Sequence, residues 1–129
     1  MLIEEYFLRL EQALASCPQI EQITLTKERR AFHIGLVKGE IVFAGGVRLF
    51  LMEFVQTEPQ VVKTKYRYHC QDASGNLLFR YDNAPHHQTD TFPHHKHLFR
   101  FSSEEMVTAT HPPSIEAVLD EIIRLVEKK

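Results

Sequence analysis

Histidines are concentrated in one short stretch of this 129-residue sequence. Five of the eight histidines fall between His86 and His97. An imidazole, with an ordinary pKa of about 6.5, can accept or donate a proton near neutral pH, and it is also a common metal ligand. The stretch therefore predicts proton-transfer chemistry, a metal site, or a loop whose histidines bond to the backbone.

The metal hypothesis depends on the His-x-His spacing of His95 and His97. Zinc or another divalent metal could bind there, with His86 or His87 and an oxygen of Asp82 or Asp90 completing the ligand set. His-x-His is a weak pattern by itself, and no Cys or Glu stands at a supporting spacing. The simplest expectation is that the protein uses no cofactor.

The proton-transfer hypothesis applies the same histidines to a phosphodiester. A neutral His would take the proton of a ribose 2′-hydroxyl, a protonated His would give one to the leaving oxygen, and cations would stabilise the developing charge. Asp82 or Glu53 would orient one imidazole. The candidate catalytic residues are His86, His87, His94, His95, His97, Asp82 and Glu53. The candidate substrate-binding residues are Arg80, Arg67, Lys65, Tyr66, Tyr81 and Lys96.

The candidate cations belong to a predicted β-hairpin just upstream of the histidines. If the turn at residues 72–75 closes symmetrically, Tyr68 faces Phe79 and Arg67 faces Arg80. One face is then aromatic, and we expect helices to cover it. If the aromatic face were instead exposed to solvent, it would be a platform for base stacking, formed by Tyr66, Tyr68, Phe79 and Tyr81. Like charges directly opposite each other cost up to about 1 kcal/mol. The cationic face therefore predicts either an anion-binding platform or a solvated face whose charges deter aggregation. This face comprises Lys63, Lys65, Arg67, His69 and Arg80.

Glu53 is a single carboxylate on an otherwise apolar strand face, which it shares with Leu49, Leu51 and Val55. One interpretation is a buried acid bonded to a Tyr or an Arg. The other is a carboxylate that orients a catalytic group or has a raised pKa.

Two amphipathic helices flank a region of strands. The first spans Leu2 to Leu14 and ends before Pro18, and the second follows Ser114, the expected N-cap, and reaches Val126. Short turns between strands favour antiparallel pairing of consecutive strands. We predict an α+β fold: one domain over residues 1–129, with a single antiparallel sheet of about five to seven strands and both helices on one face. The expected strands are residues 20–26, 31–38, 40–44, 47–57, 60–71 and 76–83, and residues 94–101 form a further candidate.

Composition limits the class of protein. The net charge of −2 excludes a globally basic nucleic-acid binder, although it allows a local basic patch. No apolar run approaches the ~20 residues that span a membrane, and the acidic N-terminus is not a secretory signal. Cys17 and Cys70 fit no zinc or redox spacing, so we expect two reduced, buried thiols in a cytoplasmic protein.

Three blocks of the sequence resemble the TumE-type toxin family of bacterial toxin–antitoxin modules. They are residues 66–69 (YRYH), 80–87 (RYDNAPHH) and 92–97 (FPHHKH). The similarity extends from about Ile34 to Val126 and includes the closing helix. It implies a cytoplasmic toxin, from a family long catalogued as a domain of unknown function, that is neutralised by a cognate antitoxin protein encoded beside it.

The leading hypothesis combines the resemblance with the chemistry: a toxin that acts on RNA by acid–base chemistry of histidine. The alternatives are a non-enzymatic module that docks on a protein through its sheet edge, and a metal-binding protein that uses the clustered histidines. We expect no membrane partner, and a homodimer remains open.

Overall fold

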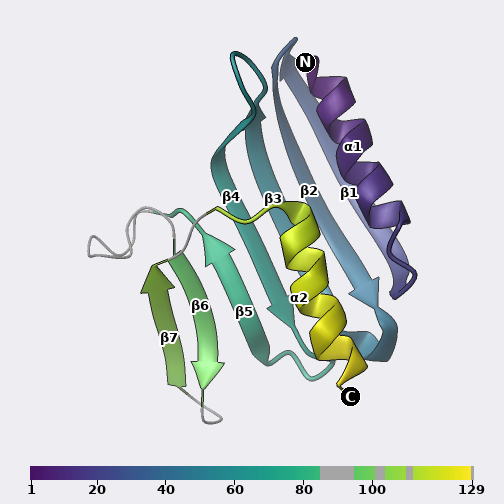
Figure 1. Cartoon of the computed structure of the whole chain (residues 1–129), viewed down its shortest axis with the longest axis vertical. Coiled ribbons are helices and arrows are strands. Elements are labelled where there is room, and N and C mark those ends of the chain that lie inside the picture. Colours follow the sequence, from purple (N-terminus) through teal and green to yellow (C-terminus); the bar gives the residue numbers. More distant parts are fainter. Residues whose placement is uncertain (85–94, 101–103, 110–111, 129) are drawn as a thin grey trace.

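The chain forms one antiparallel sheet whose strands follow each other in sequence order, with two helices on one face (Figure 1). The computed structural model describes the backbone of residues 1–84, 95–100, 104–109 and 112–128, and the side chains of residues 1–84, 96 and 112–128. The predicted α+β fold is confirmed, and seven strands lie at the upper end of the predicted range. The strands are β1 (Ile20–Ala31), β2 (Ile34–Phe43), β3 (Arg48–Gln56), β4 (Val62–Gln71), β5 (Leu77–Asp82), β6 (His95–Arg100) and β7 (Glu104–Ala109).

Both predicted helices are present and lie on the same face of the sheet (Figure 1). Helix α1 (Ile3–Ala15) buries Phe7, Leu10 and Leu14, and helix α2 (Ile115–Glu127) buries one comparable apolar stripe. The side chain of Ser114 caps α2 by accepting a hydrogen bond from the Ala117 N–H, at 3.1 Å. The helix start that the sequence predicts is therefore correct.

The core lies between the helices and the face of the sheet that they cover. Strand side chains alternate between the two faces, and those that face the helices are buried. Both cysteines are buried, as predicted. The buried strand residues of this face include Val37, Ile41, Leu49, Leu51, Val55, Tyr66, Tyr68, Cys70 and Phe79.

Two turns predicted in the first half of the sheet are wrong. Residues 27–29 continue β1 instead of ending it, because an edge strand that is exposed at nearly every position tolerates a run of charges. Gly39 lies inside β2, opposite Leu25, whose Cδ2 atom lies 2.5 Å from where a Cβ would stand. Gly39 therefore marks a close approach between strands, and the chain turns at Phe32 and His33 instead. Strand β7 had no sequence prediction.

The predicted register of the β4–β5 hairpin is wrong by two residues. Arg67 lies opposite Asp82, and His69 lies opposite Arg80. The difference arises at the turn, where Asp72 Oδ1 accepts the N–H groups of Ser74 and Asn76 and a bulge follows at the start of β5. Because the displacement is an even number of residues, Arg67, His69 and Arg80 keep their predicted face. The predicted face of Lys63 is wrong, because a bulge in β4 places it opposite Val55 and beside Glu53, on the face that the helices cover.

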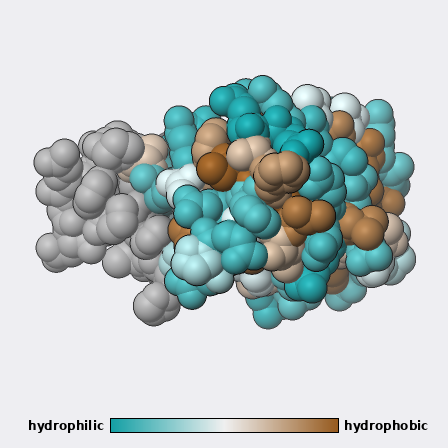
Figure 2. Space-filling model, turned by 90° about the horizontal axis from the view of Figure 1, so that it is seen from above, coloured by the Kyte–Doolittle hydropathy of each residue, from teal (hydrophilic) through white to brown (hydrophobic). Residues whose placement is uncertain are grey.

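The end of the molecule that carries the N-terminus is mostly hydrophilic, with hydrophobic residues set among polar ones (Figure 2). Phe32, between β1 and β2, is the most exposed of the large apolar residues described, at 66%. Exposed apolar residues of this kind are ordinary on a protein surface.

The contact between α1 and the sheet depends on a missing side chain at Gly35. A Cβ there would lie 2.6 Å from Ile3 Cγ1 and 2.7 Å from the Cζ of Phe7, both buried. We expect Gly35→Ala to lower the free energy of unfolding by about 1–3 kcal/mol, because the helix must move away from β2. Urea denaturation measures this.

The control is Gly39→Ala on the same strand. Its nearest clash is with the flexible end of Leu25, so the loss should be smaller. Equal losses at both positions would contradict the proposed contact of α1 with β2.

Candidate functional site

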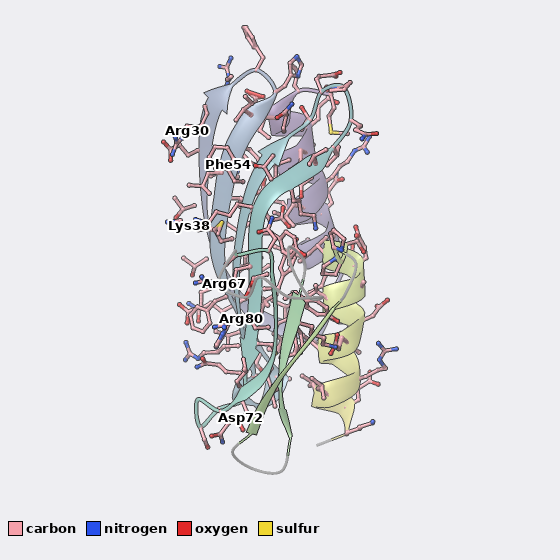
Figure 3. The ribbon with its side chains drawn as sticks, turned by 90° about the vertical axis from the view of Figure 1, so that its left-hand side faces the viewer. Arg30, Lys38, Phe54, Arg67, Asp72 and Arg80 are labelled. Atoms are coloured by element: carbon pink, nitrogen blue, oxygen red, sulfur yellow. The ribbon has the colours of Figure 1, made fainter. Side chains whose placement is uncertain are left out.

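The face of the sheet opposite the helices, here called the open face, carries the candidate cations. Arg67 and Arg80 extend from β4 and β5 on the side away from the helices (Figure 3). Their strand neighbours on this face are His69 and Asp82, and the register pairs Arg67 with Asp82 and His69 with Arg80. Neighbours of this kind are about 5–8 Å apart, so all four side chains occupy one compact patch.

Strand β6 brings two of the clustered histidines to the edge of this patch. In the backbone register, His97 lies opposite Arg80 and His95 lies opposite Asp82. Paired residues of antiparallel strands belong to the same face of a sheet. Positions 95 and 97 therefore belong to the open face.

Three other candidate histidines, His86, His87 and His94, lie outside the described residues. Zinc binding by His95 and His97 also stays a prediction, since their side chains are not described. Among the side chains that are described, no three His, Cys, Asp or Glu groups gather closely enough to hold a metal ion.

His69 is the described imidazole at the centre of the open-face patch. Its Nε2 donates to the amide oxygen of Gln71 at 3.1 Å, so Nδ1 carries the lone pair. Its ring meets the Phe50 ring edge-on, with centroids 6.0 Å apart. Burial lowers the pKa of His69 below 6.5, the positive charges of Arg80 and Arg67 lower it further, and the bond to Gln71 opposes these effects. His69 is thus suited to be a neutral base, a role that the sequence analysis missed by counting this residue among the cations.

Asp82 anchors Arg80 in the patch. Arg80 Nε lies 3.2 Å from Asp82 Oδ2, and Asp82 is only 2% exposed. The other carboxylate oxygen accepts the N–H of Ala84 at 3.1 Å, which fixes the end of β5. Arg67 stands opposite the same residue in the strand register, so the patch has two arginines for one carboxylate and a net positive charge.

Lys65 also lies on the open face, beside Arg67 along β4. Four other candidate residues do not share this site, because they lie on the face that the helices cover. They are Tyr66, Tyr81, Lys96 and Glu53. Tyr66 is buried in the core. Tyr81 and Lys96 both bind Glu121 of α2, at 2.7 and 2.9 Å. The predicted substrate contacts are therefore divided between two faces of the sheet.

Glu53 is a fully buried, partnered acid, as one of its two interpretations predicted. It accepts hydrogen bonds from the hydroxyls of Tyr6 in α1 and Tyr68 in β4. Lys63 Nζ lies 3.7 Å from Glu53 and donates to Tyr68 Oη and to the carbonyl of Pro113, at 2.5 and 2.6 Å. Burial lowers the pKa of Lys63, and Glu53 partly offsets this, while burial and Glu53 raise the pKa of both tyrosines. The network ties together both helix starts and two strands.

The fold and the open face define a small α+β domain with a cationic, histidine-bearing sheet surface. A family model described as "Toxin TumE" matches residues 10–129, so the chain belongs to the TumE toxin family, as the sequence blocks indicated. Searches of curated proteins and of solved structures found no match. Family membership makes the chain a toxin component whose expected partner is a cognate antitoxin.

Neither helix in the described part of the chain is long and apolar enough to cross a membrane.

The charges around His69 predict its titration. Its imidazole should titrate below pH 6.5, so that it is mostly neutral at pH 7 and gains a proton as the pH falls through the lowered pKa. Replacing Arg80 with Gln removes a repulsive charge, and the pKa should then rise toward 6.5. NMR titration of the ring protons, assigned with a His69→Gln variant, measures both values.

Arg29→Gln is the matched control, because Arg29 lies at the distant β1–β2 end of the sheet. It should leave the titration of His69 unchanged. A His69 midpoint above 6.5 in the parent protein would contradict the described geometry.

The Glu53 network predicts a stability cost for removing one hydroxyl. Tyr68→Phe takes a donor from Glu53 and an acceptor from Lys63, and it should lower the free energy of unfolding by about 1–3 kcal/mol. Tyr81→Phe is the matched control, since its bond to Glu121 is only part-buried and should contribute less. Chemical denaturation of both variants tests this, and equal losses would count against the network.

Proposed function

We propose that this toxin acts on RNA, and that it cleaves the phosphodiester by metal-independent acid–base chemistry on the open face. The observation that carries the proposal is the position of His69: an imidazole with a lowered pKa lies opposite Arg80 and on the same face as Arg67. A base held beside two guanidinium groups is the arrangement that attack on a phosphate requires.

In the proposed reaction, Nδ1 of His69 removes the proton of a ribose 2′-hydroxyl. The 2′-oxygen then forms a bond to phosphorus while the bond from phosphorus to the 5′-oxygen breaks. A second, protonated histidine gives its proton to that 5′-oxygen, and positions 95 and 97 are the candidates because of their register beside Asp82 and Arg80. The products are a 2′,3′-cyclic phosphate and a 5′-hydroxyl.

Arg67 and Arg80 hold the phosphate and stabilise the charge that develops on its oxygens. Asp82 orients Arg80 through their 3.2 Å ion pair, and it accepts no proton in this scheme. Glu53 lies on the covered face, where its network stabilises the fold.

The experiment is incubation of purified protein with single-stranded RNA in the presence of EDTA. We expect cleavage that survives EDTA, and we expect no cleavage at a nucleotide whose 2′-hydroxyl is replaced by hydrogen. His69→Gln and Arg80→Gln should each reduce the rate by about 10²-fold or more, while growth arrest on expression is lost in parallel.

The control is Arg29→Gln, which should cleave at the parental rate. Cleavage that requires a metal, or that persists without the 2′-hydroxyl, would overturn the mechanism. No change in RNA at any protein concentration would overturn the enzymatic function itself.

The second candidate is a non-enzymatic module that binds a protein through its sheet edge. One observation favours it: β1 is an end strand of 12 residues and is exposed at nearly every position. Such a strand can accept a further strand from a partner. Antitoxin binding at β1 is compatible with catalysis on the open face, so the RNA assay decides between them.

A further inference from the structure

A groove runs along the open face from the open-face patch of Arg67, His69, Arg80 and Asp82 toward the β1–β2 end of the sheet. It encloses about 670 Å³ between strands β1 and β4. Leu36, Phe50, Met52 and Phe54 form its apolar floor, and Lys38, Lys65 and Arg67 lie around it. Arg67 belongs to both the groove and the open-face patch, so the two are continuous.

The groove separates apolar and basic side chains into neighbouring columns. On β3 the open-face residues are Phe50, Met52 and Phe54. Directly opposite them on β4 stand His69, Arg67 and Lys65, in that order. Within each column the residues repeat every ~6.6 Å, and the columns are about 4.8 Å apart. An apolar column thus runs beside a basic one along the whole groove.

The carboxylates near the groove are already engaged. Glu40 is bound by Arg48, and Glu28 is bound by Arg30 at 3.0 Å. Arg30 also lies over the Phe54 ring, 5.7 Å from its centroid. Lys38, Arg30 and Arg67 extend from this side of the sheet (Figure 3). The groove is therefore apolar and positively charged, although the whole chain has a net charge of −2.

We propose that this groove binds a single-stranded segment of RNA, with unpaired bases on the Phe50–Phe54 column and phosphates along Lys65 and Arg67. The inference rests on the proposed function and names its substrate class. The sugar–phosphate backbone of the bound RNA would continue past Arg67 to His69 and Arg80. The groove thus positions the nucleotides on one side of the cleaved bond.

Unpaired bases explain both columns at once. A duplex presents phosphates to a protein but hides the faces of its bases, so it would use the cations and leave the aromatic floor without a ligand. A single strand offers a flat apolar face and a charge at every nucleotide, and base stacking on aromatic side chains is tolerant of sequence. Phe50 supports this interpretation, since it is 37% exposed on a face that no helix covers.

The test is the equilibrium binding of a fluorescent 2′-O-methyl RNA oligonucleotide, measured by anisotropy. This probe lacks the nucleophilic hydroxyl, so it reports binding independently of cleavage. We expect the single strand to bind at least ten-fold more tightly than the same sequence in a duplex. Phe54→Leu removes the ring and should weaken binding by roughly ten-fold, whereas Phe54→Tyr keeps the ring and should bind like the parent.

Phe32→Leu is the matched control. Phe32 is also an exposed aromatic residue beneath an arginine, with Arg29 Cζ 4.6 Å from its ring centroid, but it lies at the β1–β2 turn outside the groove. This variant should bind the oligonucleotide as tightly as the parent. A circular dichroism melt of each variant shows that the fold is retained.

The outcomes separate the groove from the chemistry. Binding that depends on Phe54, together with uncleaved RNA, would support the groove and overturn the proposed reaction. Cleaved RNA together with parental binding by Phe54→Leu would overturn the groove and leave the reaction standing. Equal affinity for duplex and single strand would also overturn the groove, as would equal affinity for poly-glutamate, which would indicate an acidic protein segment as the ligand.

Discussion

The two-residue period of the β-strand determines which side chains enter the core of this protein and which gather on the open face. On β4, Tyr66, Tyr68 and Cys70 point to one face and Lys65, Arg67 and His69 to the other. The aromatic residues must be removed from water, and both helices pack on their face. The basic residues are consequently left together on the open face. The burial that stabilises the fold thus also assembles the cationic surface.

The covered face contains a fully buried carboxylate, Glu53, and its position has a structural explanation. Glu53 lies deep in the core, where two tyrosine hydroxyls and Lys63 surround its carboxylate. Removing such a carboxylate from water is costly unless its oxygens are bonded, and here the bonds come from α1 and β4. Lys63 extends the network to the backbone before α2. The polar network therefore connects elements that are far apart in the sequence.

Sequence patterns predicted the fold class, both helices and the faces of Arg67, His69 and Arg80, because periodicity and turn residues are local signals. They placed Lys63 on the wrong face, because the bulge that turns it toward the helices interrupts the two-residue period of β4. They did not predict the exact partners of Arg67 and Arg80, since a bulge and the bonds of Asp72 determine register. A turn was wrongly predicted at Gly39, because a glycine that makes room for Leu25 cannot be distinguished in sequence from a glycine in a turn. The role of His69 as a candidate base depends on the nearby arginines, which only the register places beside it. Tyr81 and Lys96 lie on the opposite face of the sheet from Arg80, because α2 covers their face and binds both through Glu121.

The bonds of Glu121 to Tyr81 and Lys96 have a consequence for the strand that carries the last two histidines. Neighbouring residues of a strand point in opposite directions, so the anchor at Lys96 is flanked by positions 95 and 97. The C-terminal helix α2 thus holds β6 in place through the bond between Glu121 and Lys96. The edge of the open face at β6 is therefore supported by a contact on the opposite side of the sheet, where a molecule bound to the open face does not reach.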